Sequence, residues 1–451
     1  MKAPRAWGLA LKTAPEVILL TLILVAVGGL VQHLLVAGYL RQPFIWDTND
    51  TFMDWFNTAY WANRPGAYSV WRTVYPPLSF VFLQVFSSPR CYAAASFVAR
   101  DCDTVGLSAI FVFYVLGMAL AFRAFMLQDR RTAIIRGLAL TFSFPALFVL
   151  ERGNLIIPCF IFFVLAHGDV VKNRWVRAVS AGFTINFKPY LLVPVLALGV
   201  KRRWSDLEKA GIATAGVYLL TWAILGSGSL AELLENTKNW VRFTQGSPLG
   251  QVYQTTSFNS FYGVLKRGFP ILHYTDSRTL AFWMQSTWIC MIATQLLAIA
   301  ALIGTWLQPN AATRNRIAVI LLALLLTQQS PGGYTELFIL FLVFLEPWKR
   351  PGPVIATITC YLIAMPYEHL FALLPETHTK SWIMGREVSA QFGIGYGQFL
   401  RPAGLLLILF SLSADTLFLV WRAHRKERPL FNLVRLRPAA LPQPADLAMA
   451  R

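Results

Sequence analysis

The run Val17-Ile-Leu-Leu-Thr-Leu-Ile-Leu-Val-Ala-Val-Gly-Gly-Leu-Val31 contains no charged side chain. With its apolar neighbours it reaches about 20 residues, the length that an α-helix needs to cross the hydrocarbon core of a bilayer. The whole chain has the same character, because 56% of its 451 residues are hydrophobic and only 14% are charged. Soluble domains carry roughly 25% charged residues. This composition excludes a soluble enzyme, a disordered protein and a nucleic-acid-binding domain, and it predicts an all-α polytopic membrane protein.

The basic residues predict the orientation of the spans. Cytoplasmic loops of membrane proteins collect Lys and Arg, so the net charge of +18 requires no nucleic-acid partner. Lys2, Arg5 and Lys12 precede the first span, which therefore runs outward. Following the basic clusters along the chain, we expect about 10–12 membrane segments, some of them partial. Both termini are then cytoplasmic, in the inner membrane of a bacterium.

The remaining segments predict one integral membrane domain over 1–451, with an outer cap. We expect external loops over 38–104, 229–280 and 369–400, and a basic cytoplasmic tail over 422–451. The apolar piece Pro76–Phe86 is too short to cross a bilayer and predicts a helix on the outer membrane surface. Helix breaks are expected at Glu151-Arg152-Gly153-Asn154 and at Lys188-Pro189.

The cysteines and histidines show no spacing typical of metal ligands, so we expect no metal and no cofactor. Cys91 and Cys102 lie in the first external loop, where an oxidising compartment permits a disulfide. Their spacing alone leaves open whether they pair.

Polar residues that are costly at membrane depth gather at one predicted side, the outer face. They come from separate parts of the chain, as expected for a single pocket at the boundary between water and lipid. They are Asp47, Asp50, Asp54, Arg72, Glu151, Arg152, Asn154, Lys188, Asn259, Arg267 and Tyr334.

Two of these acids suit general-base chemistry. Aromatic residues at 52, 55, 56 and 60 predict an amphipathic surface helix in which Asp50 and Asp54 share one face. Carboxylates on one face repel each other, and such repulsion raises a carboxyl pKa, which favours proton abstraction from a hydroxyl. The alternative for Asp50 is a helix cap or a solvated loop acid.

The same loop resembles that of the GT-C glycosyltransferases, and more narrowly of glycosyltransferase family 87. The resemblance rests on motifs that follow one another in the family's order. They are Asp54-Trp-Phe-Asn-Thr-Ala-Tyr60, Pro65-Gly-Ala-Tyr68, Val74-Tyr-Pro-Pro-Leu78, Gly153-Asn154, Asn186-Phe-Lys-Pro-Tyr190 and Asn259-Ser-Phe-Tyr-Gly263 with Arg267. The family's late Ser-Pro-x-x-Trp-x-His element is reduced here to Ser330-Pro-Gly-Gly-Tyr334, without a histidine.

The resemblance implies an inverting enzyme that transfers a sugar, mannose in family 87, from a polyprenyl-phosphate donor to a glycan or glycolipid acceptor at the outer face. A carboxylate must take the acceptor's proton, and cations must stabilise the departing phosphate. We assign Asp54 as the base and Asp50 as the second choice. Lys188, Arg267 and Arg152, in that order, are the expected phosphate ligands. Tyr75, Asn154, Asn259 and Tyr334 are the expected substrate-binding residues.

Simpler roles stay open for several of these residues. Lys188 could reach the membrane interface, Arg152 could pair with a neighbouring acid, and Tyr75 could anchor the interface. Two other functions also stay open: a transporter or flippase of lipid-linked sugars, and a polymerase or ligase of lipid-linked glycans. The clustering of charge at one face, without a repeated half, favours the glycosyltransferase.

Overall fold

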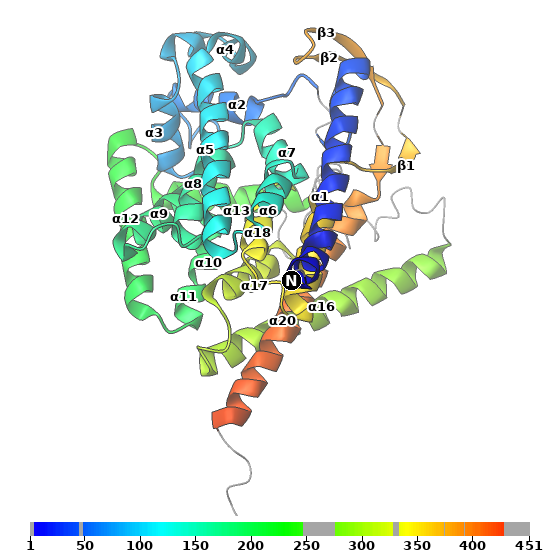
Figure 1. Cartoon of the computed structure of the whole chain (residues 1–451). Coiled ribbons are helices and arrows are strands. Elements are labelled where there is room, and N and C mark those ends of the chain that lie inside the picture. Colours follow the sequence, from blue (N-terminus) through cyan, green and yellow to red (C-terminus); the bar gives the residue numbers. More distant parts are fainter. Residues whose placement is uncertain are drawn as a thin grey trace, which may run out of the picture.

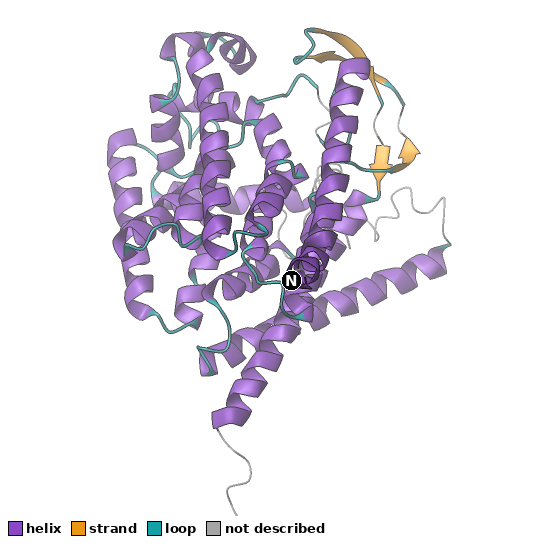
Figure 2. Ribbon diagram, in the orientation of Figure 1, coloured by secondary structure: helices purple, strands orange, loops and turns teal. Residues whose placement is uncertain are grey.

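The computed structural model describes residues 4–44, 48–246, 276–327, 333–373, 375–391 and 393–427. This part of the chain is mostly helical, and its few short strands lie beside the upper end of α1 (Figure 1, Figure 2). The longest helices are α1 (Pro4–Ala37), α5 (Thr104–Gln128), α12 (Trp204–Leu225), α16 (Ser277–Leu307) and α20 (Gly397–Glu427).

Shorter elements fill the space between the long helices. They are α6 (Ala133–Thr141), α7 (Phe144–Arg152), α8 (Ile156–His167), α9 (Arg174–Phe187), η2 (Pro189–Leu191), α10 (Leu192–Val195), α11 (Ala197–Val200), α17 (Arg314–Leu326), η4 (Gly333–Thr335), α18 (Glu336–Phe344) and α19 (Pro351–Ile363). A further group belongs to the predicted external loops: α2 (Met53–Ala62), α3 (Pro77–Val85), η1 (Pro89–Ala93), α4 (Ser96–Cys102) and α13 (Leu230–Gly246).

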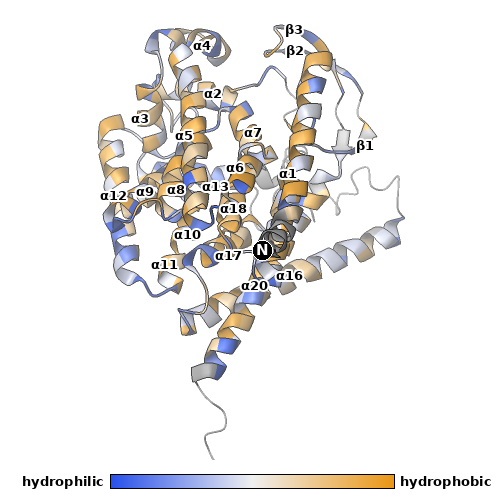
Figure 3. Ribbon diagram, viewed as in Figure 1, coloured by the Kyte–Doolittle hydropathy of each residue, from blue (hydrophilic) through white to orange (hydrophobic). Residues whose placement is uncertain are grey.

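Four helical stretches of the described chain are long and apolar enough to cross a membrane: Ala14–Ala37, Thr104–Gln128, Ser277–Leu307 and Phe399–Arg425. Two bent pairs, α6 with α7 and α12 with α13, raise the number to six if each pair is one span. Apolar residues cover much of these helices (Figure 3). The chain therefore has the helix lengths and composition of an all-α membrane protein, as the sequence predicted, whereas the expected number of about 10–12 membrane segments, partial ones included, stays a prediction.

Helix α18 forms the centre of the molecule. Every residue from Leu337 to Phe344 is at most 1% exposed, as expected for a helix that is apolar on all sides. It contacts α6, α7, α8, α17 and α19. One end of α18 follows Tyr334, and the other leads to Glu346, so this helix connects the two polar regions described below.

The structure confirms both predicted helix breaks. Helix α7 ends at Arg152 because Gly153 takes the left-handed conformation, with φ of 61°. Helix α9 ends at Phe187, and Lys188 is extended before Pro189, as the residue before a proline favours.

The first external loop is packed more tightly than the sequence suggested. Helix α3 contacts α2, α9 and α12 through a buried face that includes Leu78, Phe80 and Leu83. Trp55 and Phe56 of α2 are fully buried. Their apolar surface is therefore covered by protein, and the prediction that it rests on the bilayer was wrong for these side chains.

The loop over 369–400 contains strands that the prediction of an all-α fold missed. Strands β1 (Leu370–Leu373) and β4 (Gly393–Gly395) pair antiparallel, as do β2 (Thr377–Ser381) and β3 (Arg386–Ala390). In β3, Val388 and Ala390 alternate with exposed residues and pack against Tyr39. Alternation of this kind carries no long apolar run, so a search for membrane spans overlooks it.

Helical structure also extends further than expected in two places. Helix α13 occupies the first part of the predicted 229–280 loop, and a capping box stabilises its start. The Glu232 amide donates to Ser229 Oγ, and the Ser229 amide donates to the Glu232 carboxylate. Helix α20 continues to Glu427, into the predicted tail. The rest of the tail, 428–451, lies outside the described residues.

Candidate functional site

The start of α2 and the end of α7 are locked together by backbone contacts. The Phe52 amide donates to the Glu151 carbonyl at 2.7 Å, and Phe52 is left-handed, with φ of 64°. A Cβ on Gly153 would lie 3.1 Å from the Phe52 backbone, so glycine is needed there both for its φ and for this approach. This junction places the side chains of Arg152 and Asn154 opposite Asp54 of α2.

Asp54, in the first turn of α2, is held from two directions. Arg152 pairs with Asp54 and also with Asp50, while the Asn154 amide donates to Asp54 Oδ2 at 2.6 Å. Asn154 is itself fixed, because its Oδ1 accepts from the Ile156 amide at 3.0 Å. Arg152 therefore does pair with neighbouring acids, which was the simpler role left open for it.

The expected geometry of the two acids was wrong in one respect. Helix α2 begins at Met53, so Asp50 lies in the preceding turn and does not share a helical face with Asp54. The two carboxylates meet through one guanidinium, whose positive charge offsets the repulsion that the spacing predicted.

Lys188 enters the same region from α9. It is 8% exposed, and its Nζ lies 4.4 Å from the centre of the Tyr75 ring. Among the described residues, no carboxylate or hydrogen-bond acceptor pairs with this ammonium group. Burying an unpaired charge is costly, and a cation–π contact offsets only part of that cost.

Two tyrosine side chains lie close to both Lys188 and Asp54. Tyr75 lies close to Asp54, Thr58 and Asn154, and burial together with the negative charge of Asp54 raises the pKa of Tyr75 above its ordinary value. Tyr75 is therefore a neutral phenol at physiological pH. Tyr334 stacks on Phe148, with ring centres 5.8 Å apart, and is near enough to Lys188 and Asp54 to interact electrostatically.

The structure thus brings together seven of the nine predicted site residues: Asp50, Asp54, Tyr75, Arg152, Asn154, Lys188 and Tyr334. We call this group the outer cluster. The other two, Asn259 and Arg267, lie outside the described residues.

Three further polar side chains, each within two residues in sequence of a member of the outer cluster, were not among the predicted catalytic or binding residues. The Tyr190 hydroxyl, Glu151 Oε2 and both Glu336 oxygens are buried without a hydrogen-bond partner in the described chain. Their positions held a signal, since Tyr190 follows Lys188-Pro189 and Glu336 follows Tyr334 by two residues. Their burial could not be read from the sequence.

An open cavity of about 540 Å³ adjoins the far end of α2. Trp61, Arg64 and Gln84 contribute to its wall. Trp61 is seven residues beyond Asp54, which corresponds to about 10 Å along a helix. The described residues that line the cavity do not include any member of the outer cluster, so the two are neighbouring but separate features of α2.

A disulfide joins Cys91 to Cys102 next to this cavity, with the two Cα atoms 5.6 Å apart. It decides the pairing that the sequence left open. Disulfides persist in oxidising compartments, and the external placement expected for this loop stays a prediction.

Within the described ranges, no group of three or more His, Cys, Asp or Glu side chains is arranged to hold a metal ion. The expectation of metal-free chemistry stays a prediction.

Comparison of the chain with protein-family models, with curated proteins and with solved structures gives no match. The resemblance to glycosyltransferase family 87 therefore stays a prediction based on the motifs.

Proposed function

We propose that the outer cluster transfers a sugar from a polyprenyl-phosphate donor to the hydroxyl of a glycan or glycolipid acceptor. The observation that carries the proposal is that an oriented carboxylate, Asp54, and a buried cation without an ionic partner in the described chain, Lys188, lie on either side of Tyr75. Glycosyl transfer from a lipid phosphate needs a base on one side of the anomeric carbon and positive charge on the other.

Asp54 is the base in this mechanism. Arg152 occupies its Oδ1 and Asn154 its Oδ2, and each oxygen of an ionised carboxylate can accept more than one hydrogen bond. A substrate hydroxyl therefore still has an acceptor position. As the acceptor oxygen forms its bond to the anomeric carbon, its proton passes to Asp54.

Lys188 receives the leaving group. The bond between the anomeric carbon and the phosphate oxygen breaks, and the lipid phosphate gains negative charge as it departs. An ammonium group on a largely buried side chain that lacks a carboxylate partner in the described chain is well suited to that charge. Arg152 is committed to Asp50 and Asp54, so in this mechanism it positions the base and is not a phosphate ligand.

The location of the cluster supports a membrane-bound lipid donor at the outer face. The cluster lies at helix breaks between apolar helices, and the disulfide is nearby. The 540 Å³ cavity beside α2 is the expected entrance for the acceptor.

The test is transfer from radiolabelled polyprenyl-phosphate mannose by membranes that contain the native protein or Asp54→Asn. The substitution keeps the shape of the side chain and removes the base, so we expect the rate to fall by about 10²–10⁴-fold. Asp101→Asn is the matched control, because Asp101 lies at the same end of the molecule with a mostly exposed side chain. Its rate is expected to equal that of the native protein.

Two results would contradict the proposal. One is equal transfer by the native and Asp54→Asn proteins. The other is movement of the labelled lipid across native vesicles without transfer to any acceptor, which favours a flippase.

A further inference from the structure

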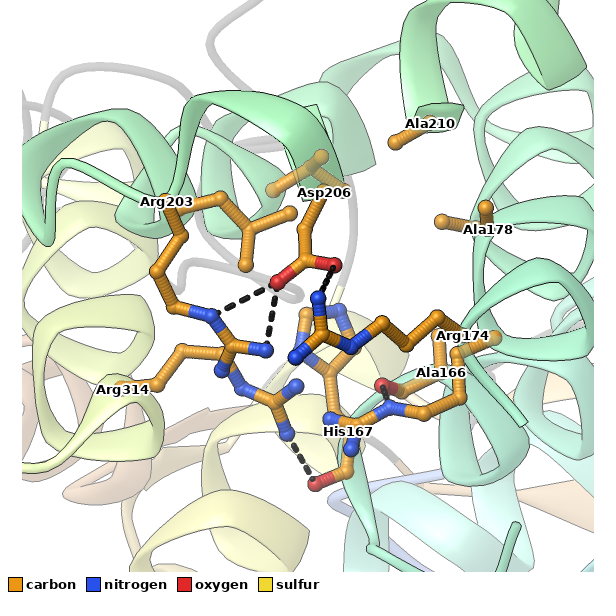
Figure 4. Close-up of a pocket in the computed structure, with 12 residues that line it drawn as sticks. Ala166, His167, Arg174, Ala178, Arg203, Asp206, Ala210 and Arg314 are labelled. Carbon is orange, nitrogen blue, oxygen red and sulfur yellow. Dashed lines mark hydrogen bonds and ion pairs between the residues drawn. The ribbon is translucent and has the colours of Figure 1, made fainter. Parts of the chain in front are cut away.

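A second polar site lies at the opposite ends of the helices that carry the outer cluster. Asn154 and Lys188 lie before α8 and after α9, whereas this site includes His167 at the end of α8 and Arg177 near the start of α9. The 14 residues of α9 separate the two sites by about 20 Å. A cavity of about 40 Å³ occupies the site (Figure 4). It has room for about three water molecules, or for a group of the size of a phosphate.

Positive charge dominates the wall of this cavity. Of the described residues that line it, four are arginines and one is an acid; they are Arg174, Arg177, Arg203, Arg314 and Asp206. Asp206 pairs with Arg203 and, at 3.8 Å, with Arg174. Both ion pairs are drawn in Figure 4. Asp169 pairs with Arg177 and Arg314, but its side chain is 64% exposed and water screens it. Two carboxylates therefore face four guanidinium groups.

Three helices begin at this cavity and add to its positive potential. They are α9, α12 and α17, which start at Arg174, Trp204 and Arg314. The N-terminus of a helix carries partial positive charge and favours anions. The arginines in the first turns of α9 and α17 are therefore in an unfavourable position, because their positive charge is repelled by the positive end of the helix. An anion bound among them would offset this repulsion.

The topology of a membrane protein does not explain where these arginines point. Basic residues that set orientation normally extend into water or lipid headgroups. Here the side chains of Arg177 and Arg314 are 19% and 13% exposed. Arg314 donates to the His167 carbonyl at 3.0 Å, and Arg177 donates to the Ala166 carbonyl at 3.3 Å. Nη2 of Arg177 is buried without a partner in the described chain.

His167 is the second sign of a missing ligand. It is 4% exposed and lines the cavity, yet neither ring nitrogen has a hydrogen-bond partner among the described residues. Its ring packs against Phe163, with centres 4.5 Å apart. Buried polar side chains in native proteins are normally hydrogen-bonded, so two unused nitrogens need an explanation.

We propose that this cavity binds a phosphate group, either free or in the headgroup of an anionic phospholipid. Arg177 Nη2 and a His167 N–H supply unused donors, and the mostly exposed Arg174 can turn towards the same anion. Phosphate has several acceptor oxygens and forms charge-assisted hydrogen bonds with guanidinium groups, which matches donors that come from different helices.

The test measures binding rather than sugar transfer, so its result does not depend on the function proposed for the outer cluster. The full-length protein in a neutral detergent is titrated with inorganic phosphate at constant ionic strength, and the thermal unfolding midpoint is followed. In a second arm, the protein is placed in phosphatidylcholine bilayers with or without phosphatidylglycerol. A ligand that binds only the folded protein raises the midpoint.

The informative variants are His167→Phe and Arg177→Gln. His167→Phe keeps a ring against Phe163 and removes both nitrogens, so it is expected to fold even if Arg177→Gln does not. Each variant should weaken the apparent affinity for the bound phosphate by about tenfold or more, the effect of one lost charge-assisted hydrogen bond. Arg130→Gln is the matched control, because Arg130 is an exposed arginine outside the cavity.

A response to inorganic phosphate that both variants weaken supports the proposal, with free phosphate as the ligand. A response to phosphatidylglycerol alone, weakened in the same way, supports it with a lipid headgroup as the ligand. The proposal is overturned if neither probe raises the midpoint. It is also overturned if His167→Phe responds as strongly as the native protein and Arg130→Gln.

Discussion

The two ends of α18 carry ionic clusters of similar composition and different organisation. The inner network, at the Glu346 end, consists of Glu16, Arg136, Arg316, Glu346, Arg350, Tyr361 and Asp415. Arg136 binds both oxygens of Glu16, at 2.8 and 2.9 Å, and Tyr361 donates to the same carboxylate. Arg316 forms ion pairs with Glu346 and Asp415, and Arg350 forms a second ion pair with Asp415.

The outer cluster, at the Tyr334 end, has the same motif of one arginine between two acids. Arg152 holds Asp50 and Asp54 as Arg316 holds Glu346 and Asp415. The acids of the inner network are at most 6% exposed, whereas those of the outer cluster are 20% and 23% exposed. The outer cluster also contains Lys188, which has no ionic partner in the described chain. We infer that a closed, dry network stabilises the fold and that an open one binds a substrate.

Arg316→Gln should produce the largest loss of stability. It leaves Glu346 and part of Asp415 buried without their cation, and breaking a buried pair from one side costs about 3–5 kcal/mol. Thermal unfolding of the purified protein measures the loss, and the transfer rate per folded molecule should not change. A fall in that rate without a fall in the unfolding midpoint would show that the inner network is not mainly structural.

Lys188→Gln should have the next largest effect, on catalysis rather than on stability. Removing one group that stabilises developing charge costs about 10²–10³-fold in kcat. The unfolding midpoint should stay the same or rise, because the substitution removes a buried charge that lacks an ionic partner. Lys201→Gln is the control, since Lys201 follows α11, outside the outer cluster, and its ammonium group donates to two backbone carbonyls in the described chain. Equal kcat for the two variants would remove Lys188 from the mechanism.

Arg152→Gln gives the direct comparison with Arg316→Gln. Its partners are partly exposed, so water can solvate them, and the stability loss should be only about 1–2 kcal/mol. The transfer rate should nevertheless fall, because the substitution frees Asp54 from its orientation. Arg152→Lys should recover part of the rate if positive charge is what matters. Losses of stability that match those of Arg316→Gln would contradict the distinction between the two clusters.

Tyr75→Phe should have the smallest effect. The ring stays over Lys188, and the hydroxyl is not needed as an acid because burial and Asp54 raise the pKa of Tyr75, which keeps the phenol protonated across physiological pH. We expect the rate to fall by less than about tenfold, the net worth of one neutral hydrogen bond. The alkaline limb of the pH–rate profile should not move. A shift of that limb in Tyr75→Phe would show that the tyrosine titrates during the reaction.

Much of the architecture followed from the sequence by itself. Long uncharged runs identified the helices that can cross a membrane, because no other regular structure hides its backbone polar groups within one segment of chain. Gly153 and Pro189 marked the helix breaks, since each restricts the backbone in a way that does not depend on distant residues. The same local signals explain why residues such as Asp54 and Lys188 could be selected as candidates.

Two further elements, the start of α13 and strand β3, also have local sequence signals, although they were not predicted. The capping box at Ser229 and Glu232 predicts a helix start in the 229–280 segment. The alternation of Val388 and Ala390 with polar neighbours predicts a strand. Both features are short and amphipathic, and a reading based on apolar length does not detect them.

Partners, by contrast, were decided only by the tertiary structure. Lys188 and Arg152 were both expected as phosphate ligands, first and third in order, but folding places Arg152 between two carboxylates and Lys188 over a tyrosine ring. The same holds for Arg177 and Arg314. In the sequence they are basic residues of the kind that set membrane orientation, whereas in the folded protein their side chains line a cavity. The physical reason is that a charge is defined functionally by its nearest neighbours and its access to water, and those come from segments far apart in the chain.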